Sequence, residues 1–116
     1  MAKLIKFTFG YLDTVCDSEG RPYLDDNFRS AYYGIPGLIA LYQSERLAPG
    51  KQFITFFPYE SGSTQRYLKT SVGNLEEQNN KVRVTTAHNS YSFHVDPDCM
   101  PDIEKKILCL NTINRP

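Results

Sequence analysis

The sequence predicts a mainly β (α+β) protein that forms one domain over residues 1–116. The expected architecture is a small antiparallel barrel or a strongly bent antiparallel sheet, with one to three short helices. Residues 66–96 contain three runs in which apolar and polar residues alternate, and β-branched and aromatic residues dominate these runs. The chain has 116 residues, of which 41% are hydrophobic and 22% charged. It is therefore long enough to bury a core without disulfides or a metal ion.

The three runs of residues 66–96 are predicted to be consecutive antiparallel strands. Successive side chains of a strand point to opposite faces, so a half-buried strand alternates apolar and polar residues. Residues 76–80 and 88–89 carry asparagines that suit the two hairpin turns. The predicted buried face consists of Leu68, Val72, Val82, Val84, Tyr91, Phe93 and Val95.

The chain before residue 50 is predicted to contain strands and a helix. Residues 3–9 alternate as a strand with Ile5, Phe7 and Phe9 on one face, and short strands at 12–16 and 21–24 flank a turn. An aspartate at position 25 or 26 can cap a helix that runs to Tyr33, with Phe28, Ala31 and Tyr32 as its buried stripe. Residues 36–47 fit helix and strand equally well, because apolar residues recur at both spacings.

Two further elements follow from the remaining sequence. Residues 51–57 are rich in strand formers on both faces, which predicts a central strand, and residues 58–63 form a loop after it. Residues 102–110 fit a helix with Ile103, Ile107 and Leu110 facing the core, or a last strand.

Composition limits the classes of partner. Lys plus Arg and Asp plus Glu number 13 each, so no concentrated positive field draws the chain to nucleic acid or to an anionic membrane by default. No apolar run spans a bilayer or suits an export signal, and three widely spaced cysteines argue against a disulfide framework. We expect a cytoplasmic protein that has no membrane partner.

Four short motifs lie between residues 40 and 96, about half of the chain. They are Leu47-x-Pro49-Gly50-Lys51 with Phe53, Tyr67-Leu68-Lys69-Thr70-Ser71, Lys81-Val82-x-Val84-x-Thr86 and Asn89-Ser90-x-x-Phe93. With these motifs the region resembles small accessory proteins of bacteria, phages and mobile elements. The resemblance implies an SH3-like barrel and a mobile-element setting, with no activity attached.

Catalytic and metal-binding patterns find little support in the sequence. His88, His94, Cys99 and Cys109 lack the close pairwise spacing of zinc ligands, and nothing in the sequence places a histidine base within hydrogen-bond reach of a cysteine. The carboxylates around residues 13–19 and 96–102 lack the order of a calcium loop, and no phosphate-binding loop occurs. We therefore predict a non-catalytic protein without cofactor or metal. A small enzyme, which would need a pocket joining Asp or Cys to His, is the third alternative.

Two surfaces are candidates for binding. Loop-borne aromatics supply rigid contact area for a protein partner, and Tyr32, Tyr33, Phe57 and Tyr59 are the predicted contact residues. A basic sheet face carrying an aromatic can meet phosphates and stack a base, and Tyr67, Lys69, Lys81 and Arg83 form that alternative. The preferred hypothesis is a small protein-interaction or regulatory module, with nucleic-acid binding as the runner-up.

Overall fold

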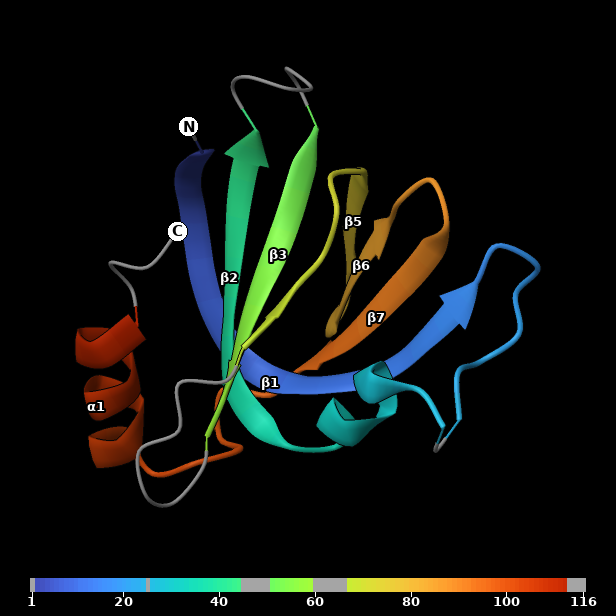
Figure 1. The fold of residues 1–116 in the computed structure, drawn as a ribbon. Helices are drawn as coiled ribbons and strands as arrows, with labels where there is room; N and C mark the ends of the chain where they lie inside the picture. The colour runs from blue at the N-terminus through green and yellow to red at the C-terminus, as the bar shows by residue number, and fades with distance from the viewer. Residues whose placement is uncertain (1, 25, 45–50, 60–66, 113–116) are drawn as a thin grey trace.

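The fold is a seven-stranded antiparallel sheet that bends strongly upon itself, as the computed structural model in Figure 1 shows. The structure describes residues 2–24, 26–44, 51–59 and 67–112. The strand order is β4-β3-β2-β1-β7-β6-β5, and the sheet is not closed. This confirms the predicted mainly β class and gives a small, barrel-like domain.

The described residues form two helical elements and seven strands of different lengths. The helical elements are the 3-10 helix η1, Phe28–Tyr32, and the helix α1, Asp102–Thr112. The strands are β1 Ala2–Asp17, β2 Pro36–Ser44, β3 Gln52–Pro58, β4 Leu68–Lys69, β5 Asn74–Gln78, β6 Lys81–Thr85 and β7 Asn89–Val95. In the described residues no helix is long and apolar enough to cross a membrane.

Strand β1 is the corner of the sheet. Its residues 2–11 pair with β2 and its residues 10–17 pair with β7, so that Gly10 and Tyr11 belong to both pairings. A side chain at Gly10 would collide with the main-chain oxygen of His94, so only glycine allows the two backbones to approach this closely. The strands predicted at 3–9 and 12–16 are therefore two parts of one bent strand (Figure 1).

A second crossing joins the two ends of the sheet. The chain leaves the edge strand β4, passes through residues 70–73 and enters the opposite edge strand β5. Gly73 exchanges two backbone hydrogen bonds with Gln52 of β3, at 2.8 and 3.1 Å. The connection thus ties the ends together although β4 and β5 do not pair.

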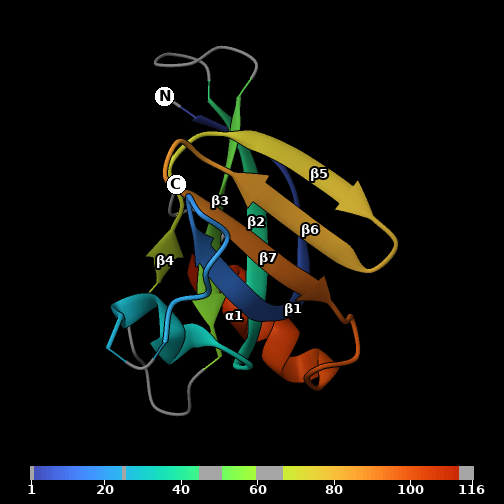
Figure 2. The same ribbon diagram turned by 90° about the vertical axis from the view of Figure 1, so that its right-hand side faces the viewer.

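The corner divides the sheet into two halves that face each other, and Figure 2 shows β5, β6 and β7 crossing in front of β2 and β3. We call residues 2–9 of β1 with β2, β3 and β4 the apolar half. Residues 10–17 of β1 with β5, β6 and β7 are the polar-faced half. The two halves enclose an inner cluster, in which the Phe56 and Phe93 rings lie 5.7 Å apart.

An outer cluster lies on the other face of the apolar half. Leu38, Ala40, Tyr42, Phe53 and Phe57 are buried there, and Leu108 and Cys109 of α1 pack against them. Strands β2 and β3 are consequently buried on both faces. This agrees with the central strand predicted at 51–57 and shows that the ambiguous residues 36–44 are strand; residues 45–47 lie outside the described residues.

The prediction of three consecutive strands within residues 66–96 is wrong for the first run. Only Leu68 and Lys69 form a strand there, and they pair with β3. The partner of β6 is β5, so the hairpin turn is Asn79–Asn80 and not 76–80, with Asn79 at a φ of 56°. Because the chain bends at residues 70–73, Leu68 packs in the inner cluster whereas Val72 packs in the outer one.

The face of residues 3–9 that carries Ile5, Phe7 and Phe9 is only partly buried. Ile5 and Phe7 are 46% and 41% exposed, and Phe9 packs on the outer cluster. A register shift between Leu4 and Lys6 reorients the strand locally. Alternation identified the strand, but it did not show that one of its faces has little cover.

Three smaller predictions need correction. Residues 21–24 form no strand and contribute only a bridge between Cys16 and Pro22. The cap of the short helix is Asn27, whose side chain accepts from the Arg29 amide, and Asp25 lies outside the described residues. Of the predicted stripe of η1, Tyr32 is buried, while Phe28 is 64% exposed and Ala31 is exposed as well. Part of the loop predicted at 58–63, from residue 60 onwards, also lies outside the described residues.

Candidate functional site

The four aromatic residues predicted to bind a protein partner do not form one exposed patch. Tyr32 is 6% exposed in the inner cluster and Phe57 is 4% exposed in the outer cluster. Tyr33 and Tyr59 are half-buried. Phe57 and Tyr59 stand at the end of β3, while Tyr32 and Tyr33 belong to the segment around η1.

The Tyr33 side chain connects two backbone segments by hydrogen bonds. Its hydroxyl accepts a hydrogen bond from the Val15 amide at 3.2 Å and donates to the Tyr23 carbonyl oxygen at 2.9 Å. These bonds hold the segment after β1 against the end of the strand. Tyr33 therefore packs at the end of the sheet.

The four residues of the predicted basic strip fall in different halves of the molecule. Tyr67 and Lys69 belong to the region of β4, where the Lys69 ammonium lies 5.0 Å from the centre of the Phe53 ring. Lys81 and Arg83 lie on β6, between β5 and β7. The structure keeps the second pair together and separates it from the first.

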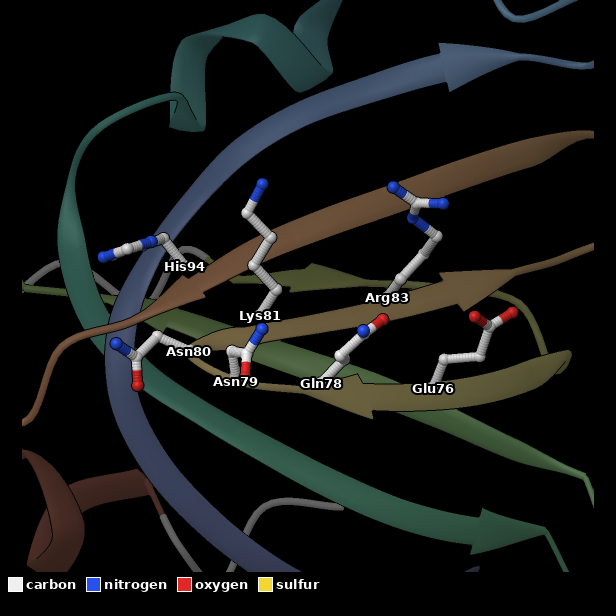
Figure 3. A pocket seen from close by; sticks show the side chains of 7 residues that line it. All are labelled: Glu76, Gln78, Asn79, Asn80, Lys81, Arg83 and His94. Atoms are coloured by element: carbon white, nitrogen blue, oxygen red, sulfur yellow. The ribbon is translucent and has the colours of Figure 1, made fainter.

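The outer face of the polar-faced half carries a shallow hollow of about 530 Å³, which we call the polar hollow (Figure 3). Alternation along β6 points Val82 and Val84 into the core and Lys81 and Arg83 outward. The cross-strand pairs bring the other lining side chains beside these cations. The hollow is lined by Glu76, Gln78, Asn79, Asn80, Lys81, Arg83 and His94.

An aromatic residue that the sequence analysis missed adjoins this hollow. Tyr11 pairs with His94 on β7, and His94 pairs with Lys81 on β6, so the three side chains form one cross-strand row. The Tyr11 and His94 rings lie 5.0 Å apart, with a 32° angle between their planes. No sequence signal links Tyr11 to Lys81, because 70 positions separate them and only the pairing of β1 with β7 joins them.

A second hollow of about 420 Å³ lies on the same face and shares the lining residue Arg83 with the polar hollow. Its wall includes the 86–89 hairpin, where the Thr86 hydroxyl accepts from the Asn89 amide at 3.0 Å. Asp17 also lines it. The backbone amide of Arg21 donates to that carboxylate and, with the Arg21 guanidinium, lowers the pKa of Asp17. Arg21 therefore compensates the negative charge of the Asp17 carboxylate in the wall of the second hollow.

The third concave region is an apolar groove between α1 and β1. It has a volume of about 550 Å³ and is lined by Phe9, Asp102, Lys105, Lys106, Cys109 and Leu110. The Lys105 ammonium lies 5.5 Å from the centre of the Phe9 ring and 3.4 Å from the Asp102 carboxylate. The groove thus has an apolar floor and cations along its rim.

The helix α1 exposes the stripe that was predicted to be buried. Residues 103, 107 and 110 recur at the spacing of one helix face, and of the two alternatives predicted for residues 102–110 the structure shows the helix. That face points away from the sheet, because Leu108 and Cys109 make the contact instead. Ile103, Ile107 and Leu110 are 64%, 47% and 79% exposed.

Burial affects two of the three thiols. Burial is the main factor that raises the pKa of the Cys99 and Cys109 thiols, which lowers the fraction of reactive thiolate. Among residues 2–24, 26–44, 51–59 and 67–112, no group of three His, Cys, Asp or Glu side chains could hold a metal ion.

Comparison with models of protein families, with curated proteins and with solved structures finds no match to this chain. The case for a function consequently rests on its surfaces.

Proposed function

We propose that this chain is a non-catalytic protein-interaction module that binds a partner protein through an apolar surface beside α1. The docking surface consists of Phe7, Phe9, Ile103, Ile107 and Leu110. The observation that carries the proposal is the outward-facing stripe of α1. A surface helix normally turns such a stripe to the core, so a second protein is needed to remove this one from water.

The five side chains adjoin one another. The Phe7 and Phe9 rings are 6.1 Å apart, and Phe9 and Leu110 line the same groove. From Leu110 the stripe continues one helical turn at a time to Ile107 and Ile103. Apolar area is therefore continuous from β1 to the outer side of the helix, in the form that a helix or strand of a partner can cover.

Charge indicates the chemistry of that partner. Lys106 stands beside the middle of the stripe and has no ion-pair partner in the part of the chain that the structure describes. Two copies of α1 packed antiparallel about a two-fold axis would bring their Lys106 ammonium groups together, which is unfavourable. We therefore assign the surface to a different protein, one that presents an apolar segment flanked by carboxylates.

The proposal is tested by affinity capture followed by reconstitution. The wild-type chain, Ile107→Asp and the control Leu24→Asp, which changes a 68% exposed apolar residue far from α1 in sequence, are used as baits. We expect a partner that the wild type and Leu24→Asp retain and Ile107→Asp loses. With the purified partner, Ile107→Asp should weaken binding at least about tenfold, and Lys106→Glu should weaken it as well.

Two results contradict this assignment. Equal affinity of Ile107→Asp and Leu24→Asp for the purified partner would place the contact elsewhere. Sedimentation of the wild type as a dimer that Ile107→Asp converts to a monomer would show that a second copy covers the stripe.

We also propose an accessory role in the cytoplasm of a bacterium, or in a phage or mobile element. The resemblance of residues 40–96 to small accessory proteins supports this setting and an SH3-like barrel geometry. The unpaired thiols Cys16, Cys99 and Cys109 agree with a reducing compartment. Identification of the genes that flank this one would test the setting directly.

A further inference from the structure

We propose that the outer face of the polar-faced half binds single-stranded nucleic acid, which lies along β6 and β7 with Arg83 at its centre. This site is separate from the docking surface of the proposed partner protein, because it lies on the other half of the sheet and contains none of the same residues.

The shape of the surface calls for a long ligand. The polar hollow and the second hollow share Arg83, so together they form one track from the Asn79–Asn80 turn to the 86–89 hairpin. The track follows the strands of the polar-faced half. A linear polymer can occupy both hollows while it crosses the Arg83 side chain.

The cations of this track indicate that the polymer is anionic. Lys81 and Arg83 are two positions apart on the exposed face of β6, so their side chains project on the same side about 7 Å apart. Within the described residues Lys81 forms no ion pair, and the Arg83 guanidinium donates there only to the Ser92 hydroxyl, at 3.3 Å. Side chains of this kind bind backbone phosphates and set the register of the strand.

The planar groups beside the cations distinguish nucleic acid from other polyanions. The Tyr11 and His94 rings stand side by side next to Lys81, and His88 lies in the second hollow at the other end of the track. Tyrosine and histidine rings stack the unpaired bases of single strands. A duplex keeps its bases stacked and paired, so these rings can stack only on the bases of a single strand.

Polar side chains in the polar hollow can form hydrogen bonds with the edges of bases. The carboxamides of Gln78, Asn79 and Asn80 line the polar hollow, and Figure 3 shows them beside Lys81. Each carboxamide both donates and accepts hydrogen bonds, as a base edge does. Glu76 pairs with Arg83 in register but forms no ion pair with it, which leaves the guanidinium available to the ligand.

The contacts predict how binding depends on salt. Two phosphates neutralised by Lys81 and Arg83 give a slope of log K against log salt of about −1.4. Binding should therefore weaken about sevenfold between 50 and 200 mM salt.

Fluorescence anisotropy of labelled RNA and DNA oligonucleotides of about ten nucleotides tests the site with the whole chain. We expect micromolar binding of single strands at low salt and weaker binding of duplexes. Arg83→Gln or Lys81→Gln should halve the salt slope, and His94→Ala should weaken binding about tenfold without changing that slope. Lys69→Gln removes an exposed cation at the other end of the sheet and should leave the affinity unchanged.

The proposal is overturned if single strands do not bind at low salt, if duplexes bind as tightly, or if Lys81→Gln and Arg83→Gln retain wild-type affinity. A sulfated polysaccharide that binds more tightly than either oligonucleotide also overturns it. Ile107→Asp should bind oligonucleotides like the wild type. Failure of this proposal and failure of the protein-interaction proposal are therefore separate results.

Discussion

The two halves of the sheet are built from the same antiparallel pairing but differ in how many of their faces are buried. In the apolar half, β2 has six consecutive buried residues and β3 likewise, so side chains pointing both ways are covered. In the polar-faced half, β6 alternates strictly, with Val82 and Val84 buried between exposed neighbours. The first half therefore needs a cover on its outer face, and the second needs none.

This difference accounts for the two kinds of surface. The helix α1 covers the outer face of the apolar half. Phe7, beside this cover, and the stripe of Ile103, Ile107 and Leu110 on the outer side of the helix remain exposed to water. The outer face of the polar-faced half meets water with cations, amides and hydroxyls, and is ready for a polar ligand. A sheet that is buried on both faces needs a covering element, and apolar side chains remain exposed beside that element and on its outer side. A sheet that is buried on one face keeps a polar face open to water.

The largest expected effect comes from breaking the contact between the halves. Phe56 of β3 is fully buried, and its ring meets Phe93 of β7 across the inner cluster. Phe56→Ala should lower the free energy of unfolding by about 4 kcal/mol, because it leaves a cavity where the halves join. Urea unfolding measures this, with Phe28→Ala, which removes a 64% exposed ring, as a control expected to change stability little. Equal losses in the two variants would mean that the halves are not held together by the inner cluster.

A smaller effect is expected at the corner where β1 passes from one half to the other. Gly10→Ala should cost about 3 kcal/mol, because the new methyl group meets the main-chain oxygen of His94 and the backbones must separate. Gly20 is the matched control, since its φ of 83° is strained for alanine although no atom lies within 4 Å of the added carbon. Gly20→Ala should cost about 1 kcal/mol, measured by thermal unfolding of both variants. The reverse order would show that the corner can be displaced easily.

The smallest expected effect tests the doubly buried strand β3. The Thr55 hydroxyl is fully buried and has no hydrogen-bond partner among the described residues. Thr55→Val should therefore stabilise the protein by about 1 kcal/mol. Thr70→Val is the control, because the Thr70 hydroxyl accepts from the Ile54 amide and donates to the Ser71 carbonyl oxygen, both at 3.0 Å. That variant should lose about 1 kcal/mol in the same urea titration, and destabilisation by Thr55→Val would reveal a partner for the hydroxyl.

Local patterns were enough to identify much of the polar-faced half. Alternation predicted β6 and β7 and the burial of Val82, Val84, Tyr91 and Phe93, because one face of these strands is buried and the other is not. The pattern also placed Lys81 and Arg83 together on an outer face. In the apolar half the same reasoning was weaker, since β2 is apolar on both faces and resembles a helix as much as a strand.

The sequence by itself determined the fold class, the strand at 51–57 and which residues share a face of β6 and β7, and it left residues 102–110 open between helix and strand. These properties depend on the periodicity of apolar and polar side chains along a single element, which can be read from the residues of that element alone. Only the tertiary structure decided that β4 pairs with β3, that Tyr11 lies beside His94, and that Ile103, Ile107 and Leu110 face water. Those outcomes depend on which elements meet, and a bend of a few residues at Gly10 or at 70–73 changes the partner of a strand without changing its pattern.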